Sequence, residues 1–244
     1  MGVFTHIWKH YNKRMVTRPR NYILYILVPL TIILANFFAN IGLNPGGDIM
    51  GVFVPASLMV LAFQYLTGEI LMYNIFTSLR GKMAERLFAS PVKRYTFITG
   101  MTASSFLLNL LQSAVIMGVI TIAFGVNLGN PAIFFGFLLL TATVSQLIAA
   151  LVSGITKSRK AADGLYTAIV LIMFVGLEFI PPVSAIFSWI TPLGLAWQGI
   201  IMNMEGQTTS ALINMALLTG ITTLVGWVLA PTLLGRRNQP GKHK

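Results

Sequence analysis

Cysteine is absent from this 244-residue chain, and histidine is scarce. The lack of cysteine excludes disulfides, thiolate metal ligands and thiol nucleophiles. The three histidines lie in the terminal segments, at His6, His10 and His243, so no histidine–carboxylate set is expected to form a metal centre or a nucleophilic triad. No Gly-x-x-x-x-Gly-Lys-Ser/Thr run that would bind nucleotide phosphates occurs either. We therefore expect this chain to have no catalytic residues, no metal and no cofactor of its own.

Charged residues are also few. Asp, Glu, Lys and Arg make up 9% of the chain, whereas soluble domains average about 25%. Hydrophobic residues make up 55%, and the mean hydropathy is +0.77. Most of the surface therefore cannot be polar and must face lipid. This composition excludes a soluble enzyme, a disordered chain and a secreted disulfide scaffold.

Long apolar runs predict the fold. A spanning helix needs roughly 20 mostly apolar residues to cross about 30 Å of hydrocarbon. Six such crossings are predicted, and Gly- and Pro-rich segments separate several of them. We therefore expect an all-α polytopic membrane protein with a single transmembrane domain over 1–244. The predicted crossings cover about 22–41, 52–79, 97–124, 132–155, 164–177 continuing towards 201, and 211–234.

The basic residues indicate how the chain is oriented in the membrane. All 17 Lys and Arg fall on one side of a six-span arrangement, in segments 9–20, 80–94, 157–160 and 236–244. The positive-inside rule makes that side cytoplasmic, which predicts a multi-pass protein of the cell membrane with both termini, including the tail 235–244, in the cytoplasm. The net charge of +11 then reflects orientation and attraction to anionic lipid rather than nucleic-acid binding. The first apolar run is long enough to span, so we expect no cleavable signal peptide.

Residues 1–21 contain an amphipathic pattern before the first span. Five apolar residues recur at helical spacing, and basic residues fill the remaining arc. This predicts a helix that lies along the inner membrane surface. A simple basic flank that only sets the topology is the alternative. The apolar positions are Phe4, Ile7, Trp8, Tyr11 and Met15.

A second amphipathic segment, 79–94, lies between the second and third predicted spans. Its apolar residues Leu79, Met83, Leu87 and Phe88 also recur at helical spacing, with charged residues between them. Such a short helix outside the membrane needs a partner for its apolar side. Lipid head groups are one candidate, and a groove on another protein is the other.

The end of this segment resembles a known family. Leu87-Phe88-Ala89-Ser90-Pro91, followed by Lys93-Arg94, is similar to the intracellular coupling segment in permease subunits of type-2 ABC exporters. That family also has six spans, cytoplasmic termini and an amphipathic helix before the first span. Phe179-Ile-Pro-Pro182 and Trp189-Ile-Thr-Pro-Leu193 are similar to its Phe-x-Pro and Asn-Pro-Leu elements, although Thr191 replaces the usual Asn and Glu85-Arg86 replaces the usual Gly-Thr.

The resemblance implies a function and partners. The chain would be a permease that exports a hydrophobic or amphipathic molecule (a drug, antibiotic, peptide or lipid-like compound) by alternating access. A separate ABC ATP-binding subunit would hold ATP and Mg, and a second permease chain would complete a homodimer or heterodimer. The residues implied to contact the ATP-binding subunit are Arg80, Lys82, Met83, Glu85, Arg86, Leu87, Phe88, Ser90 and Pro91.

Prolines interrupt the chain between 178 and 204. Because a spanning helix cannot run through Pro181, Pro182 and Pro192 without freeing backbone groups that lipid will not satisfy, span five is predicted to end near Glu178. Short re-entrant helices would follow, and in the resembled family such helices close the outer mouth of the pathway. This implies an outer gate at Phe179, Pro181, Pro182 and Pro192. One Pro-kinked span is the alternative.

Polar side chains within the predicted spans are candidates for a transport pathway. Glu69 in span two is the main one, because an ionisable group inside a membrane usually faces protein or water. The alternative is a structural Glu69, paired with Asn109, Gln112 or a basic residue at the inner surface. A rival function, a secondary transporter or channel that works without ATP, would use Glu69 as its ion or proton site. The candidate pathway residues are Glu69, Gln64, Asn109 and Gln112; Gln146 is a further polar residue within a span, and Lys157–Lys160 with Asp163 is either a solvated loop or a second ATPase contact.

Overall fold

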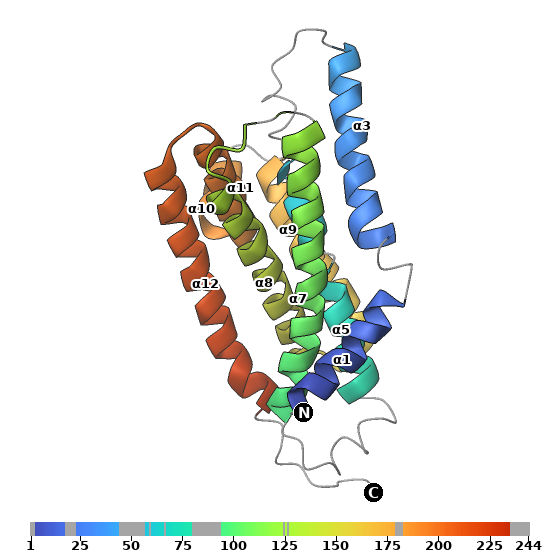
Figure 1. The fold of residues 1–244 in the computed structure, drawn as a ribbon. Helices are drawn as coiled ribbons and strands as arrows, with labels where there is room; N and C mark the ends of the chain where they lie inside the picture. The colour runs from blue at the N-terminus through green and yellow to red at the C-terminus, as the bar shows by residue number, and fades with distance from the viewer. Residues whose placement is uncertain are drawn as a thin grey trace, which may run out of the picture.

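The computed structural model describes residues 3–17, 23–43, 57–58, 60–65, 67–79, 94–123, 125, 127–178 and 183–234. All regular secondary structure in these residues is helical (Figure 1). Phe179, Pro181, Pro182, residues 80–93 of the amphipathic segment and the tail 235–244 lie outside the described residues. The helices are α1 (Val3–Val16), η1 (Ile23–Leu27), α3 (Val28–Leu43), α5 (Gly68–Leu79), α7 (Arg94–Gly118), η2 (Val119–Ala123), α8 (Pro131–Ile155), α9 (Arg159–Glu178), α10 (Val183–Ile190), α11 (Pro192–Met204) and α12 (Thr208–Leu234).

Several of these helices are suited to cross a membrane. In the described part of the chain, α7, α8, α9 and α12 each contain a stretch long and apolar enough to span, and the α10–α11 pair adds a fifth if it counts as one broken span. The first predicted span is helical over Ile23–Leu43, and the second is helical on both sides of a break near Thr67. The described part of the chain is thus all-helical, with several helices suited to cross a membrane, and the count of six spans stays a prediction.

Helix starts follow from local chemistry. The Asn130 side chain accepts a hydrogen bond from the Ala132 N–H and caps α8, with Pro131 in the first turn. Thr191 caps α11 in the same way, accepting from the Gly194 N–H ahead of Pro192. At this cap α10 and α11 meet at 94°. The predicted interruption of the chain before Pro192 is therefore present, and its assignment as re-entrant stays a prediction.

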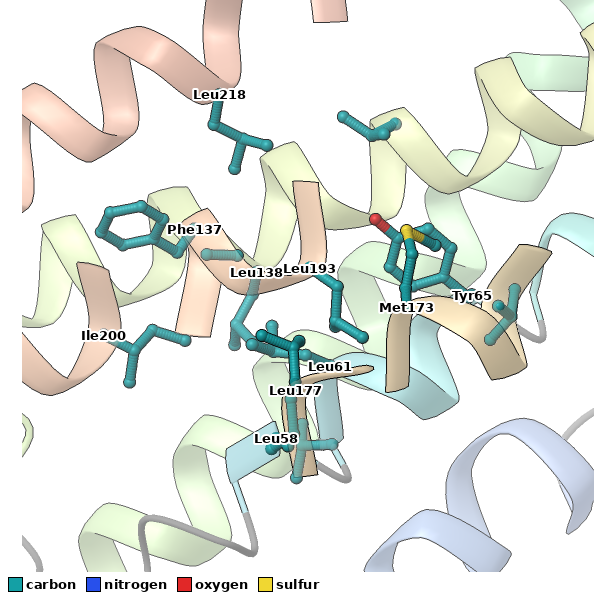
Figure 2. Close-up of a cluster of buried hydrophobic side chains, with 14 of the residues drawn as sticks. Leu58, Leu61, Tyr65, Phe137, Leu138, Met173, Leu177, Leu193, Ile200 and Leu218 are labelled. Atoms are coloured by element: carbon teal, nitrogen blue, oxygen red, sulfur yellow. The ribbon is translucent and has the colours of Figure 1, made fainter. Parts of the chain in front are cut away.

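The packed core surrounds α8, which contacts α5, α7, α9, α11 and α12. Side chains from all these helices, from α3 and from the helical residues before α5 interdigitate in one apolar cluster (Figure 2). Lipid tails are as apolar as these side chains, so close packing rather than removal from water holds the cluster together. Its members include Leu58, Leu61, Tyr65, Phe137, Leu138, Met173, Leu177, Leu193, Ile200 and Leu218.

Helix α1 lies across the lower ends of α5 and α7 (Figure 1). Ile7 and Tyr11 are buried against residues of α5, α7 and α8. Gly100 permits this approach, since a Cβ there would come within 2.7 Å of Ile7 Cγ2, and the Tyr11 hydroxyl donates to Ser78 Oγ at 2.6 Å. Two positions of the predicted apolar face thus contact protein, and the position of α1 at the membrane surface stays a prediction.

Candidate functional site in the helix core

The second helical stretch is broken in its middle, and side chains from two other helices bind the backbone at the break. The Ser145 hydroxyl of α8 donates to the Gln64 carbonyl at 3.3 Å, and the Tyr166 hydroxyl of α9 donates to the Tyr65 carbonyl at 2.5 Å. Backbone polar groups inside a membrane need such internal partners, because lipid offers none. The break therefore joins three helices at one point.

Gly68 makes this junction possible. A Cβ at Gly68 would overlap the Tyr166 hydroxyl and lie 2.8 Å from Tyr166 Cζ. Only glycine allows the two helices to approach this closely. The glycine thus fixes where α9 crosses the break.

Polar side chains extend from the break toward α7. Gln64 Nε2 donates to Ser113 Oγ at 3.0 Å. In the amide orientation that satisfies both of its polar atoms, Gln146 of α8 donates to the Thr102 carbonyl at 3.2 Å and accepts from Asn109 Nδ2. The predicted pathway residues Gln64, Asn109 and Gln112 all come from this α5–α7–α8 region, and all three are fully buried.

Some polar atoms of this layer have no hydrogen-bond partner among the described residues. These atoms are Gln64 Oε1, Asn109 Oδ1 and both amide atoms of Gln112. Burial of an amide without a hydrogen bond costs roughly 1–3 kcal/mol on the scale of protein mutations. Water or a bound ligand can supply the missing hydrogen bonds of such a group.

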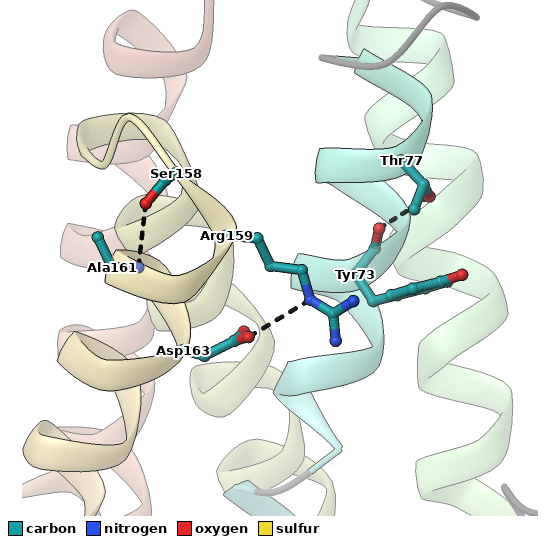
Figure 3. Close-up of polar contacts among 6 residues, drawn as sticks. All are labelled: Tyr73, Thr77, Ser158, Arg159, Ala161 and Asp163. Carbon is teal, nitrogen blue, oxygen red and sulfur yellow. Dashed lines mark hydrogen bonds and ion pairs between the residues drawn. The ribbon is translucent and has the colours of Figure 1, made fainter.

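Glu69 belongs to a separate, charged cluster between α5 and α9. It is half-buried in the first turn of α5, and the charges of Asp163 and Arg159 act on it. Arg159 Nε lies 3.3 Å from Asp163 Oδ2, and its guanidinium stacks over the Tyr73 ring at 4.7 Å from the centroid (Figure 3). Within the described contacts, no hydrogen bond joins Glu69 to Asn109 or Gln112. Among the described residues the ion pair of Arg159 is with Asp163, and a direct pairing of Glu69 with a basic residue stays a prediction.

The segment Lys157–Lys160, which runs into the first residues of α9, is exposed, as predicted for a solvated segment. Lys157, Ser158, Arg159 and Lys160 are all exposed. The Ser158 hydroxyl accepts from the Ala161 N–H at 3.2 Å (Figure 3) and so caps α9. Whether this loop contacts an ATPase stays a prediction.

A third polar feature lies at the end opposite α1, where α11 meets the turn before α8. Asn203 is 1% exposed, and its Nδ2 donates to the carbonyls of Leu128 at 2.6 Å and Asn130 at 3.0 Å. Its Oδ1 accepts from the Asn130 N–H at 3.2 Å. Gly129 has φ +65° and lies against the Asn203 backbone, leaving no room for a Cβ. Sequence reasoning missed Asn203 as a functional position, and the Gly- and Pro-rich segment Gly125–Pro131 between two predicted crossings was the signal that marked this region as a turn.

Of the four predicted gate residues, the structure describes Pro192 alone. It occupies the first turn of α11, next to the 94° bend. Phe179, Pro181 and Pro182 lie outside the described residues. In the part of the chain that is described, no three His, Asp or Glu side chains lie close enough to hold a metal ion.

Long apolar helices that pack together, with uncharged amide side chains buried between them, are typical of a polytopic membrane protein. The family model for "ABC-2 family transporter protein" matches residues 38–230, most of the chain. The chain therefore belongs to the ABC-2 transporter family, and it is a membrane permease subunit rather than an enzyme. This confirms the resemblance first drawn from residues 87–94. Searches of the curated proteins and of the solved structures gave no match.

Proposed function

We propose that this chain is the membrane subunit of an ATP-driven exporter that moves a hydrophobic or amphipathic molecule out of the cell. The observation that carries the proposal is the family match over residues 38–230, which includes the amphipathic segment 79–94. The sequence contains no phosphate-binding loop. ATP and Mg would therefore bind to a separate ABC subunit.

The ends of the two helices that flank the amphipathic segment support its role as the ATPase docking site. Helix α5 ends at Leu79 and α7 begins at Arg94, and α1 contacts both helices near these ends. Basic residues gather at this end: Lys9 and Lys13 are on α1, and Arg94 starts α7. The positive-inside rule assigns such an end to the cytoplasm, where ATP is available. Residues 80–93 connect two helices there, so a push on this segment would act on both.

Alternating access needs two regions, one that opens the pathway toward the cytoplasm and one that opens it toward the outside of the cell. The break before Gly68 supplies a pivot in the second span, next to the pathway residues Gln64, Asn109 and Gln112. At the opposite end, the bent α10–α11 pair and Pro192 would form the outer gate. Two chains, identical or closely similar, would pair to complete the transporter.

Affinity purification of the chain tests the proposal. We expect an ABC ATPase to copurify in stoichiometric amount and substrate to stimulate its ATPase activity. Glu85→Ala and Phe88→Ala should abolish the stimulation and transport but leave membrane insertion intact. Gln207→Ala, an exposed position at the opposite end, is the matched control and should behave as wild type. Wild-type coupling in either docking variant would contradict the docking assignment.

One observation favours a second candidate function. Glu69 on α5 and a second carboxylate, Asp163 on α9, form a charged cluster with Arg159. Carboxylates within membrane spans carry protons or ions in secondary transporters. Flux driven by a pH gradient in liposomes that contain this chain alone, and lost in Glu69→Gln, would favour that function over the ATP-driven one.

A further inference from the structure

Gln112 differs from Asn203, another buried amide, in its hydrogen bonding. Asn203 is as deeply buried, and both of its polar atoms are hydrogen-bonded. Gln112 is 0% exposed, and neither atom of its amide has a partner among the described residues. Polar groups inside a membrane protein are normally paired. The unpaired amide therefore needs an explanation.

Its surroundings are apolar on one side and polar on the other. Leu108, one turn before Gln112 on α7, packs against Ile70 of α5 and Ile26 of η1. Ile116, one turn after, joins the main apolar cluster. Residues four apart share a helix face, so Gln112 is the polar position in an apolar stripe.

Two further amides lie within about one helical turn of Gln112. Ser113, the next residue along α7, accepts the hydrogen bond from Gln64 Nε2, and Asn109 is three residues earlier on the same helix. Gln64 Oε1 and Asn109 Oδ1 are also unpaired within the described structure. Together with Gln112, this region offers three amide oxygens and one amide nitrogen.

These groups carry no formal charge. The charges of Glu69, Arg159 and Asp163 belong to a separate cluster between α5 and α9, whereas Gln64 bonds to α7. An ion entering the amide layer would lose its hydration without meeting an opposite charge, which is costly in a low-dielectric interior. A neutral hydroxyl or amide would satisfy the free atoms at no such cost.

We propose that Gln64, Asn109 and Gln112 form a binding position for an uncharged hydroxyl or amide group of the transported molecule. The proposal rests on the transport function and narrows its substrate class to an apolar body that bears a neutral hydrogen-bonding group. Leu108, Ile70 and Ile116 accommodate the apolar part. Gln64 lies in the last helical turn before the break, so a pivot at Gly68 would move its amide relative to α7 and open the position.

Thermal unfolding of the full chain in lipid nanodiscs tests the site without any ATPase. The probes are alkyl chains of one fixed length that carry a glucoside, a trimethylammonium or a sulfate head group, each below its solubilising concentration. We expect the glucoside to raise the unfolding temperature in a saturable way and the two charged probes to have no such effect.

Gln112→Leu is the decisive variant. Because it removes a buried, unpaired amide, it should leave the unliganded protein at least as stable as wild type. It should raise the half-saturating glucoside concentration by about tenfold, the loss expected for one or two neutral hydrogen bonds. Gln198→Leu makes the same chemical change on α11, where the amide oxygen is also unpaired among the described residues, and should leave the response unchanged. If Gln112→Leu does not fold, Asn109→Leu takes its place.

Several outcomes would overturn the proposal. These are an equal response to charged and neutral head groups, an intact glucoside response in the variant, stabilisation by sodium ions instead of glucoside, and no response to any probe, which would leave only water at the site. Failure of the permease function itself would appear separately, as the absence of a copurifying ATPase.

Discussion

Asn203 and Asn130 exchange a reciprocal pair of hydrogen bonds at the end of the bundle opposite α1. The Asn130 N–H donates to Asn203 Oδ1 at 3.2 Å, and Asn203 Nδ2 donates to the Asn130 carbonyl at 3.0 Å. Since Asn130 also caps α8, this pair ties the end of α11 to the start of the central helix. The α10–α11 region is thereby held against the turn before α8.

Asn203→Ala should release this connection. It removes three hydrogen bonds. The buried Leu128 carbonyl loses its donor, whereas the Asn130 carbonyl still accepts from the Phe134 N–H. We expect a loss of about 2–4 kcal/mol in unfolding free energy, measured by SDS-induced unfolding in mixed micelles. Gln207→Ala, exposed a few residues away, should change the unfolding free energy by less than about 0.5 kcal/mol. Equal stability of the two variants would show that the Asn203 bonds are not formed.

Gly68→Ala tests the close approach of α5 and α9. Alanine normally stabilises a helix relative to glycine by up to about 1 kcal/mol. Here its Cβ would overlap Tyr166, so we expect a loss of about 1–3 kcal/mol instead. Gly164→Ala on α9, where a Cβ meets no atom within 4 Å, should be neutral or stabilising. The unfolding free energies of the two variants, compared with wild type, should change in opposite directions. A stabilising effect of Gly68→Ala would disprove the contact between Gly68 and Tyr166.

Tyr166→Phe tests the hydrogen bond at the break. Loss of the hydroxyl that donates to the Tyr65 carbonyl should cost about 1–3 kcal/mol, because the carbonyl stays buried. The double variant Gly68→Ala/Tyr166→Phe should lose less unfolding free energy than the sum of the two single losses, because removal of the Tyr166 hydroxyl relieves part of the overlap with the new Cβ. Strict additivity in the double-mutant cycle would argue against a shared site.

Tyr11→Phe and Ser78→Ala test the attachment of α1. Their hydroxyls are 2.6 Å apart, so the double-mutant cycle should give a coupling energy of about 0.5–1.5 kcal/mol. Because Ser78 directly precedes the segment 79–94, substrate-stimulated ATPase activity should fall in both variants. His6→Ala, exposed on the same helix, should leave stability and stimulation unchanged.

Arg159→Gln tests the charged cluster between α5 and α9. The Arg159 and Asp163 side chains are 53% and 40% exposed, so the stability effect should stay below about 1 kcal/mol and shrink at high salt. Without the cation, Glu69 and Asp163 would repel each other. Glu69→Gln should therefore be less harmful in the Arg159→Gln background than in wild type, and equal effects in both backgrounds would show that Arg159 does not act on Glu69.

The sequence predicted most of the helices because apolar runs and prolines are local features. The helices near 97–124, 132–155, 164–177 and 211–234 follow apolar composition, and the interruption before Pro192 follows from its missing N–H. The break near Thr67 was not predicted. Neither glycine nor threonine in an apolar run specifies a break, which here depends on hydroxyls from Ser145 and Tyr166, more than 75 residues away along the chain.

The site was predicted only in part. Gln64, Asn109 and Gln112 were marked as polar residues in apolar spans, but periodicity could not tell which of them are paired. The structure pairs Gln64 with Ser113 and Asn109 with Gln146, and leaves Gln112 without a partner among the described residues. It also separates Glu69 from these amides and places it near Arg159.

The sequence by itself determined that this protein is a membrane protein, because composition sets the preferred solvent. From the same sequence, the location of all basic residues on one side of the membrane stays a prediction, because it depends on the count of six spans. Only the tertiary structure decided which polar groups in the core are satisfied. Hydrogen-bond partners from different helices meet through packing, and packing depends on contacts between residues far apart along the chain.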